Sequence, residues 1–457
     1  MLNSKNIAEI IYSRSNLKRI QSDKMRYEIY NGKLREYVET AIRREFILPE
    51  TVSELINRII PINITQKIVN KLAGVYINEP KREAVIYSIA DQEAIDQIED
   101  LFRLNVTMKH LNRMFKLCKM AAIEPFLYKG KPSLRCLPAH TFTLISEDLI
   151  CPEIETIFIK HISIGGADKK TDLHAVWTES EQYTMNGEGE ILPQDDYVNA
   201  YGVIPFVVIK DTPDLLMPIQ DDDLLSMQIA INLLLTDLAF ATKYQAWSLI
   251  YLIGAKAQNI KFNPNSVISL DYLDTEGKVK PEIGMIKPTI DIDGMLKEVE
   301  ALLSMLLTTK SLSVNSVSLM GSGNVSSGVA KILDSAESTE DRQDQIAVFS
   351  AAERSLFNIF TRNILPIWKN SNAINPIYEL DFSFDFELSV SYPDMSPPVT
   401  EKDEVEIEKM KVEAGLTSKR ESIKKLNPEK NEDQIDALIM EIKQDETDSQ
   451  SFTFNQE

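Results

Sequence analysis

The stretch around which the predicted fold is organised is residues 221–244, DDDLLSMQIAINLLLTDLAFATKY. Apolar residues recur in it at spacings of three and four, which predicts one long helix. The residues on this face are Leu224, Met227, Ile231, Leu234, Leu235 and Leu238. Ile229, Leu233 and Phe240 widen the apolar face. We therefore expect neighbours on more than one side of the helix, either within the subunit or in a second copy of it.

Three aspartates, Asp221, Asp222 and Asp223, stand at the expected start of this helix, shortly after Pro218. Carboxylates there can cap free N–H groups and face the positive end of the helix dipole. They could instead bind a divalent cation, but adjacent residues on a helix do not converge on one point. We favour the cap.

Two more long helices follow. The second is expected over 291–309, after an insert with short strands at 267–270 and 279–285. The third is expected from 326 to Leu365, where Pro366 ends it, and its polar middle favours a kink or a change of packing partner. Residues 310–325 between these helices have the composition of a loop.

The flanking parts mix helices and strands, so the predicted fold class is α+β. Helices are expected over 1–75 and 91–124, and small helices after the prolines that follow residue 392. Strict alternation from 378 to 392 predicts a half-buried strand. Further strands are expected at 153–164, 173–178, 182–185 and 202–209, with a hairpin turn at 186–189. Ser418 begins a capping box, and the tail after Asp445 is predicted to be disordered.

Composition indicates a globular protein without a membrane segment. The chain has 457 residues, 44% of them hydrophobic, and a net charge of −20, which argues against a protein that coats nucleic acid. Cys118, Cys136 and Cys151 form no CxxC pair, so neither a disulfide framework nor a structural zinc site is expected. We predict no signal peptide and folding in the cytosol.

Motifs for catalysis are weak. The sequence contains no GxxxxGK[ST], HExxH or GxSxG pattern, and the stretch Gly321-Ser322-Gly323 does not follow a strand. We therefore predict no catalytic, cofactor-binding or metal-binding residues and no cofactor.

The order of these parts resembles the portal proteins of tailed bacteriophages, closest to the Gp6-like portal family of siphophages. Four stretches carry the resemblance, and it covers nearly the whole chain. They are Asn63 to Gly74 with Asn78-Glu79-Pro80, Gly202-Val203-Ile204-Pro205 leading to the helix with Gln228 and Asn232, Asn324 to Ala330, and Gly415-Leu416-Thr417-Ser418 after the prolines. Residues 212–216 differ from this family, in which a Gly/Ser-rich link usually precedes the stem helix.

The resemblance implies a dodecameric ring at one capsid vertex, through which double-stranded DNA is packaged and ejected. It implies a virion protein made in the host cytoplasm, with the terminase large subunit, the head–tail adaptor, and the major capsid and scaffolding proteins as partners, and no membrane. The implied parts are a wing (1–217), stem helices (218–248 and 291–309), a clip (249–290), a tunnel loop (310–325), a long kinked helix with a wing strand (326–392), and a crown with a flexible tail (393–457).

The resemblance places five residues of the tunnel loop near DNA: Lys310, Ser318, Met320, Ser322 and Asn324. Lys310 could touch passing phosphate, or it could simply favour the end of the second helix through the helix dipole. Two other functions stay open at this stage. One is a metal-dependent nucleic-acid-processing enzyme that uses the acidic cluster, and the other is a capsid scaffold protein without a channel.

Overall fold

The computed structural model describes most of the chain, which forms two compact units. The first unit comprises 1–323 and 336–393, and the second comprises 324–335 and 394–457. The described residues are 2–85, 89–165, 169–218, 221–247, 249–253, 282–286, 289, 291–312, 328–378, 387–393, 405, 408–412, 415, 417–427 and 434–440.

Five helices fill the N-terminal part of the first unit, as the sequence predicts. They are α1 (Ser4–Ile11), α2 (Arg14–Tyr30), α3 (Leu34–Glu45), α4 (Pro49–Ile56) and α5 (Ile64–Leu72). The chain turns at Gly32, whose φ of 101° suits a residue without Cβ. The Asn63 side chain caps α5 by accepting a hydrogen bond of 3.0 Å from the Gln66 N–H.

The second helical pair ends earlier than the sequence predicts. It consists of α6 (Ile89–Phe102) and α7 (Leu104–Cys118), and residues 120–124, which we expected to be helical, begin strand β2 (Met120–Tyr128). Lys119, with a φ of 53°, stops α7. The apolar run after it is paired on both sides, with β3 (Lys131–Pro138) and β8 (Val207–Lys210). Burial in the middle of a sheet overrides the helical pattern here.

A four-stranded antiparallel sheet follows in chain order: β4 (Phe142–Ile145), β5 (Ile157–Ser163), β6 (Leu173–Trp177) and β7 (Gln182–Asn186). This sheet confirms the strands predicted at 153–164, 173–178 and 182–185, although β5 starts only at Ile157. In the strand predicted at 202–209, residues 202–206 precede β8 and do not belong to it. The turn at 186–189 is confirmed by the pairing of Met185 with Ile191. Helix α1 packs on this sheet through Ile7 and Ile11. Short 3-10 turns η1 (Ala139–Thr141) and η2 (Lys169–Thr171) connect strands.

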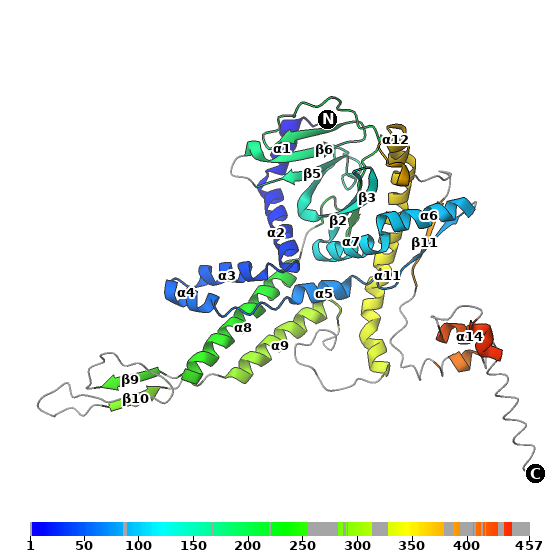
Figure 1. Cartoon of the computed structure of the whole chain (residues 1–457). Helices are drawn as coiled ribbons and strands as arrows, with labels where there is room; N and C mark the ends of the chain where they lie inside the picture. The colour runs from blue at the N-terminus through cyan, green and yellow to red at the C-terminus, as the bar shows by residue number, and fades with distance from the viewer. Residues whose placement is uncertain are drawn as a thin grey trace, which may run out of the picture. The chain divides into compact units, whose positions relative to one another are not determined.

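The two predicted apolar helices are present as α8 (Asp223–Trp247) and α9 (Ile292–Thr309), side by side in Figure 1. An antiparallel strand pair, β9 (Leu249–Ile253) and β10 (Glu282–Ile286), joins their far ends. Strand β10 overlaps the strand expected at 279–285, whereas the one expected at 267–270 lies outside the described residues. Residues 313–327, which include most of the expected loop, also lie outside them.

The third long helix differs from the prediction at its end. Helix α11 (Gly328–Asn358) passes into a π-helix, η3 (Ile359–Ile364), and then into α12 (Leu365–Asn370). Pro366 therefore lies inside α12 rather than ending the helix. The wider π turn removes the clash between the proline ring and the preceding carbonyl, and the proline stands in the first turn of α12, where no N–H partner is needed.

The alternating strand predicted over 378–392 is seen as β11 (Glu387–Ser391), paired with β1 (Lys81–Val85). Leu388 is buried and its neighbours are exposed, as the alternation predicts. Tyr378 instead ends a 3-10 turn, η4 (Pro376–Tyr378), and residues 379–386 lie outside the described residues. Strands β1 to β4 had not been predicted.

The second unit contains small helices, as expected. Ser418 caps α14 (Lys419–Leu426) by accepting a hydrogen bond of 3.2 Å from the Glu421 N–H. Residues 408–412 and 434–440 are helical, and Gly415 has a φ of 70°. The tail after Asp445 lies outside the described residues.

Candidate functional site at the head of the α8–α9 pair

The predicted site residues lie at or beyond the end of α9. Lys310 is the C-cap residue of α9, and the other four, Ser318, Met320, Ser322 and Asn324, lie outside the described residues. The structure therefore places only the root of the expected loop. That root lies at the head of α8 (Figure 1).

The end of α9 is built by a two-bond C-terminal motif. Ser311 has a φ of 54° and its N–H bonds the Thr308 carbonyl at 3.1 Å. The Leu312 N–H bonds the Leu307 carbonyl at 2.9 Å, and both leucines are buried. This is a Schellman arrangement, in which a left-handed residue satisfies the last carbonyls of a helix. It sets the direction in which the chain leaves α9.

Three cations surround the three aspartates at the head of α8. Lys310 Nζ lies 2.7 Å from Asp223 Oδ2 and 3.7 Å from Asp221 Oδ2. Lys119 Nζ lies 3.0 Å from Asp221 Oδ2. Arg26 of α2 is buried and donates to the Asp221 carbonyl at 2.6 Å and to Asp222 Oδ1 at 3.1 Å. The hydrogen bond from Lys119, with the charges of both lysines, lowers the pKa of Asp221.

This arrangement confirms the predicted capping role for Asp223 alone, whose Oδ1 accepts from the Leu224 N–H at 2.7 Å, and corrects it for the other two aspartates. Asp222 does begin the helix, because its carbonyl accepts from the Ser226 N–H at 2.9 Å, but the carboxylates of Asp221 and Asp222 are taken up by cations. Three carboxylates and three cations leave the cluster close to neutral. The described part of the chain holds no group of three His, Cys, Asp or Glu that could bind a metal. The cluster is suited to joining elements, because it ties α8, α9, α2 and the α7–β2 turn together.

A cleft of about 220 Å³ opens beside this cluster. Its charged lining consists of Lys116, Lys119, Lys310, Asp211 and Asp341. Lys116 pairs with Asp341 of α11 at 2.7 Å. Arg26, Lys116 and Lys119 carry no motif in the sequence, and only the fold brings Arg26 and Lys119 to the aspartates of α8 and Lys116 to Asp341.

Polar residues on α8 hold the segment that enters α5. The Gln228 side chain accepts from the Thr65 N–H at 2.8 Å and donates to the Ile62 carbonyl at 2.8 Å. Asn232 Oδ1 accepts from the Ile62 N–H at 2.9 Å. Both amides are buried. They join two of the stretches on which the family resemblance rests.

Helix α8 is also long and apolar enough, over Asp223–Lys243, to cross a membrane by length and composition. One third of this stretch is buried: the helix packs on α9, α3 and α5, and its Gln228, Asn232 and Thr236 are buried against protein.

A second polar seam joins α11 to the N-terminal part. Arg342 Nε donates to the Gly74 carbonyl at 2.9 Å, and Gln345 donates to the Leu72 carbonyl at 3.2 Å. Asn112 donates to Gln345 at 2.8 Å. Polar side chains in α11 therefore donate hydrogen bonds to backbone carbonyls at the end of α5 and just after it. This is the change of packing partner that the sequence favours.

Comparison with known proteins identifies the family of this chain. The family described as phage portal protein, SPP1 Gp6-like, matches residues 10–450. A search of curated proteins finds no match. Among solved structures, a chain from "Neck of empty GTA particle computed with C6 symmetry" is similar, with 11% identity, a TM-score of 0.41, and coverage of 83% of this chain and 94% of that chain. Because the family match spans nearly the whole sequence, the chain belongs to the SPP1 Gp6-like family of phage portal proteins.

Proposed function

We propose that this portal protein forms a closed dodecameric ring at one capsid vertex, with a central channel for packaging and ejecting double-stranded DNA. Membership of the family implies an oligomeric ring, association with the capsid and a structural role in the virion. The ring number, the channel and the docking partners are our proposal. The terminase large subunit would dock during packaging and the head–tail adaptor afterwards, with the major capsid and scaffolding proteins around the ring and synthesis in the host cytoplasm.

The observation that carries the proposal is the closed path of α8 and α9. The chain leaves along α8, reverses through the β9–β10 region and returns along α9 to the same place, where Lys310 meets Asp223. A projecting helix pair closed at its root suits a stem that is lined up beside its copies. The wing would then be 1–217 with 326–392, the stem 218–248 and 291–309, the clip 249–290, the tunnel loop 310–325 and the crown 393–457.

The ring is tested by mass photometry and negative-stain microscopy of the purified full chain. We expect particles of about twelve times the 51.8 kDa subunit mass, with a central hole. A chain that stays monomeric or dimeric over a wide concentration range would contradict the ring. It would favour the metal-dependent enzyme, for which Asp221→Ala and Asp223→Ala would abolish nuclease activity without changing the assembly state. A scaffold protein would form no closed ring.

The clip assignment is tested by replacing 254–281 with a short linker. We expect rings to form as before, while binding of the terminase large subunit is lost. Motor binding that survives the replacement would move the docking site elsewhere.

The role of Lys310 is tested with two variants of one ion pair. If Lys310 acts on DNA, Lys310→Ala should lower packaging efficiency and Asp223→Ala, which removes only the nearer partner of the lysine, should not. If Lys310 acts by holding α9 to α8, both variants should lower packaging to a similar extent, because each removes the same 2.7 Å contact. The second outcome would remove Lys310 from the DNA-facing set.

A further inference from the structure

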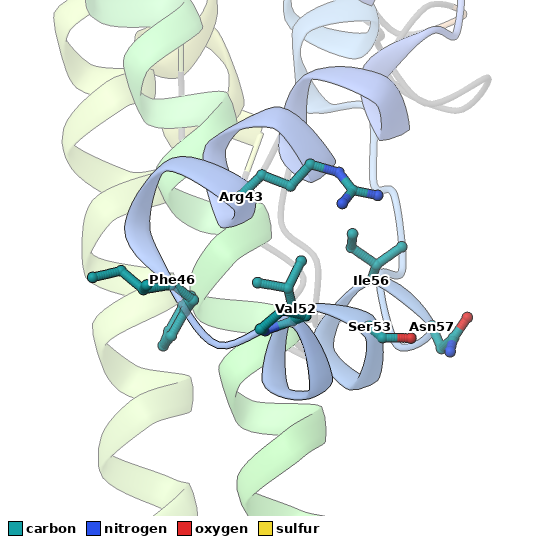
Figure 2. Close-up of a pocket in the computed structure, with 8 residues that line it drawn as sticks. Arg43, Phe46, Val52, Ser53, Ile56 and Asn57 are labelled. Carbon is teal, nitrogen blue, oxygen red and sulfur yellow. The ribbon is translucent and has the colours of Figure 1, made fainter.

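An open groove of about 450 Å³ lies between α3 and α4, on the flank of α8 (Figure 2). Its lining is mixed: Figure 2 shows Phe46, Val52 and Ile56 facing it, with Arg43, Ser53 and Asn57 supplying polar groups. Ile47 and Leu48, in the turn that joins the two helices, are 95% and 69% exposed. So large an apolar exposure beside a groove marks a surface that binds another protein.

The groove and α9 lie on opposite sides of α8. Leu225, Leu233 and Phe240 of α8 pack against α3 and α4. Leu224, Ile231 and Leu235 belong with the leucines of α9 to the main core. At 3.6 residues per turn, these two sets lie about half a turn apart on α8. In Figure 1, α3 and α4 lie on one flank of α8 and α9 lies on the other, so one subunit has the groove and the outer face of α9 on different flanks.

The net charges of the unpaired groups on the two flanks have opposite signs. Arg43 and Arg44, in the last turn of α3, are exposed and have no ion-pair partner in the part of the chain that the structure describes. Of the acidic residues on the groove side, Glu54 lies 3.8 Å from Lys243 and Glu50 stands in the first turn of α4. Glu45 is exposed beside Arg44, so the two arginines leave a small net positive charge there.

The outer side of α9 carries the matching chemistry. Glu298 and Glu300, two residues apart, lie on opposite edges of this exposed side, with Lys297 between them. Both acids are exposed and, among the described residues, without an ion-pair partner, as is Asp293 in the first turn. Met305, 59% exposed, adds an apolar side chain of the kind that fills an irregular groove.

Both surfaces lie at the same level along the helix pair. The Lys310–Asp223 contact sets α9 antiparallel to α8, so the acidic N-terminal half of α9 runs beside the C-terminal half of α8. The groove side contacts that same half: Arg58 lies 6.0 Å from the Phe240 ring, and Glu54 pairs with Lys243.

We propose that the α3–α4 groove of one subunit receives the outer face of α9 from the next subunit in the ring. A ring needs two different, complementary surfaces on each subunit, and these two flanks supply apolar shape and opposite charge. The proposal rests on the ring of the proposed function and names its contact.

The test uses two charge-reversed full-length variants, Arg43→Glu with Arg44→Glu, and Glu298→Lys with Glu300→Lys. Each variant alone places like charges across every interface. The concentration at which half of the subunits are in rings should rise at least about tenfold for each. An equimolar mixture should restore assembly, because alternating subunits then meet opposite charges at every contact. Recovery in the mixture also shows that both variants are folded.

The matched control for the Glu298/Glu300 variant reverses two exposed acids of α6, Glu93→Lys with Asp100→Lys, and makes the same change in net charge as that variant. We expect it to assemble like the wild type. Two results would overturn this contact while leaving the ring itself supported: an interface variant that forms rings at the wild-type concentration, or a mixture that assembles no better than its separate components. If the groove of such rings binds a capsid protein, the surface would be assigned to that partner instead. A wild-type chain that forms no ring would contradict the proposed function, and this contact with it.

Discussion

At the scale of single residues, a hydrogen-bond chain crosses from α1 to the four-stranded sheet. The Tyr12 hydroxyl donates to Asp172 at 2.6 Å and lies 3.2 Å from His174 Nε2. The Nδ1 atoms of His174 and His161 are 3.0 Å apart, and His161 Nε2 lies 2.9 Å from the Thr143 hydroxyl. A carboxylate only accepts, so Tyr12 must accept from His174 Nε2–H. Burial lowers the pKa of both histidines, which favours their neutral forms, and with His174 neutral its Nδ1 accepts from His161 Nδ1–H.

We expect stability to fall below pH 6.5 because of this chain. Burial lowers the pKa of His174 from 6.5 to about 4, and burial lowers that of His161 as well. Between these pH values the unfolded chain therefore binds protons that the folded chain does not bind. The contribution of the histidines to stability is fully present above pH 6.5 and is lost as the pH falls toward 4. For His174 alone the free energy of unfolding should drop by about 2 kcal/mol between pH 7 and pH 5. Denaturant unfolding at the two pH values measures it, and a His174→Phe variant should show a weaker pH dependence. Equal stability at both values would contradict the neutral pair.

A buried ion pair makes a second prediction at this scale. Arg82 and Glu353 are both fully buried and meet through two contacts, of 2.6 and 2.9 Å, while the Tyr76 hydroxyl donates to Glu353 at 2.5 Å. Glu353→Ala should lower the free energy of unfolding by about 3–5 kcal/mol, because it leaves the buried guanidinium without its main partner.

Two controls separate this charge effect from a general one. Arg82→Met combined with Glu353→Leu removes both charges and should recover most of the loss. Glu340→Ala, on an exposed position of the same helix, should change stability by less than about 0.5 kcal/mol. A Glu353→Ala variant as stable as Glu340→Ala would show that the pair contributes nothing. Denaturant unfolding at pH 7 measures all three.

At the scale of elements, α8 is the helix around which others are placed. Its three sides meet α9, the segment 62–65, and the α3–α4 pair. The contact with the segment is polar and buried, and it depends on side chains that bond backbone groups. Such contacts fix the register of an element, because a shifted partner would leave buried groups without hydrogen bonds.

We expect Asn232→Ala to reduce stability by about 1–3 kcal/mol, since the buried N–H of Ile62 loses its acceptor. Thr242→Ala on the same helix is the matched control. Its exposed hydroxyl donates to the Leu238 carbonyl one turn earlier on the same helix, so the change should stay within about 0.5 kcal/mol. Chemical denaturation measures the free energy of unfolding of both variants. An equal loss in the two would mean that the hydrogen bond from the Ile62 N–H to Asn232 contributes no more than an exposed one.

At the scale of the whole molecule, charge is the informative property. The chain carries a net charge of −20, and the cations at the head of α8 are paired with carboxylates. Tight, non-specific binding to DNA comes from releasing counterions at lysine and arginine contacts. An acidic ring would enclose DNA without gripping it, which suits a conduit driven by a separate motor.

We therefore expect no binding of the purified protein to short double-stranded DNA at 0.15 M salt, with a dissociation constant weaker than about 10⁻⁴ M. Fluorescence anisotropy with a labelled duplex measures it. Micromolar affinity that falls steeply with salt would reveal a basic surface and contradict the passive channel.

Much of this fold can be predicted from local pattern. The spacing of leucines places α8 and α9, Asn63 and Ser418 cap the helices they precede, and alternation places Leu388 on the buried side of its strand. Each of these signals acts within a few residues, so sequence neighbours are sufficient to determine it. The order of such signals along the chain also indicated the family.

What the tertiary structure alone decided are the outcomes that depend on distant partners. Met120 to Ile123 become a strand because β3 and β8 flank them, and Pro366 is accommodated because a π turn precedes it. Lys310 faces the aspartates at the head of α8 because α9 returns antiparallel to the start of α8. Hydrogen bonds and charges reach only a few ångströms, so their partners are set by the packing of segments far apart in sequence, which no local pattern encodes.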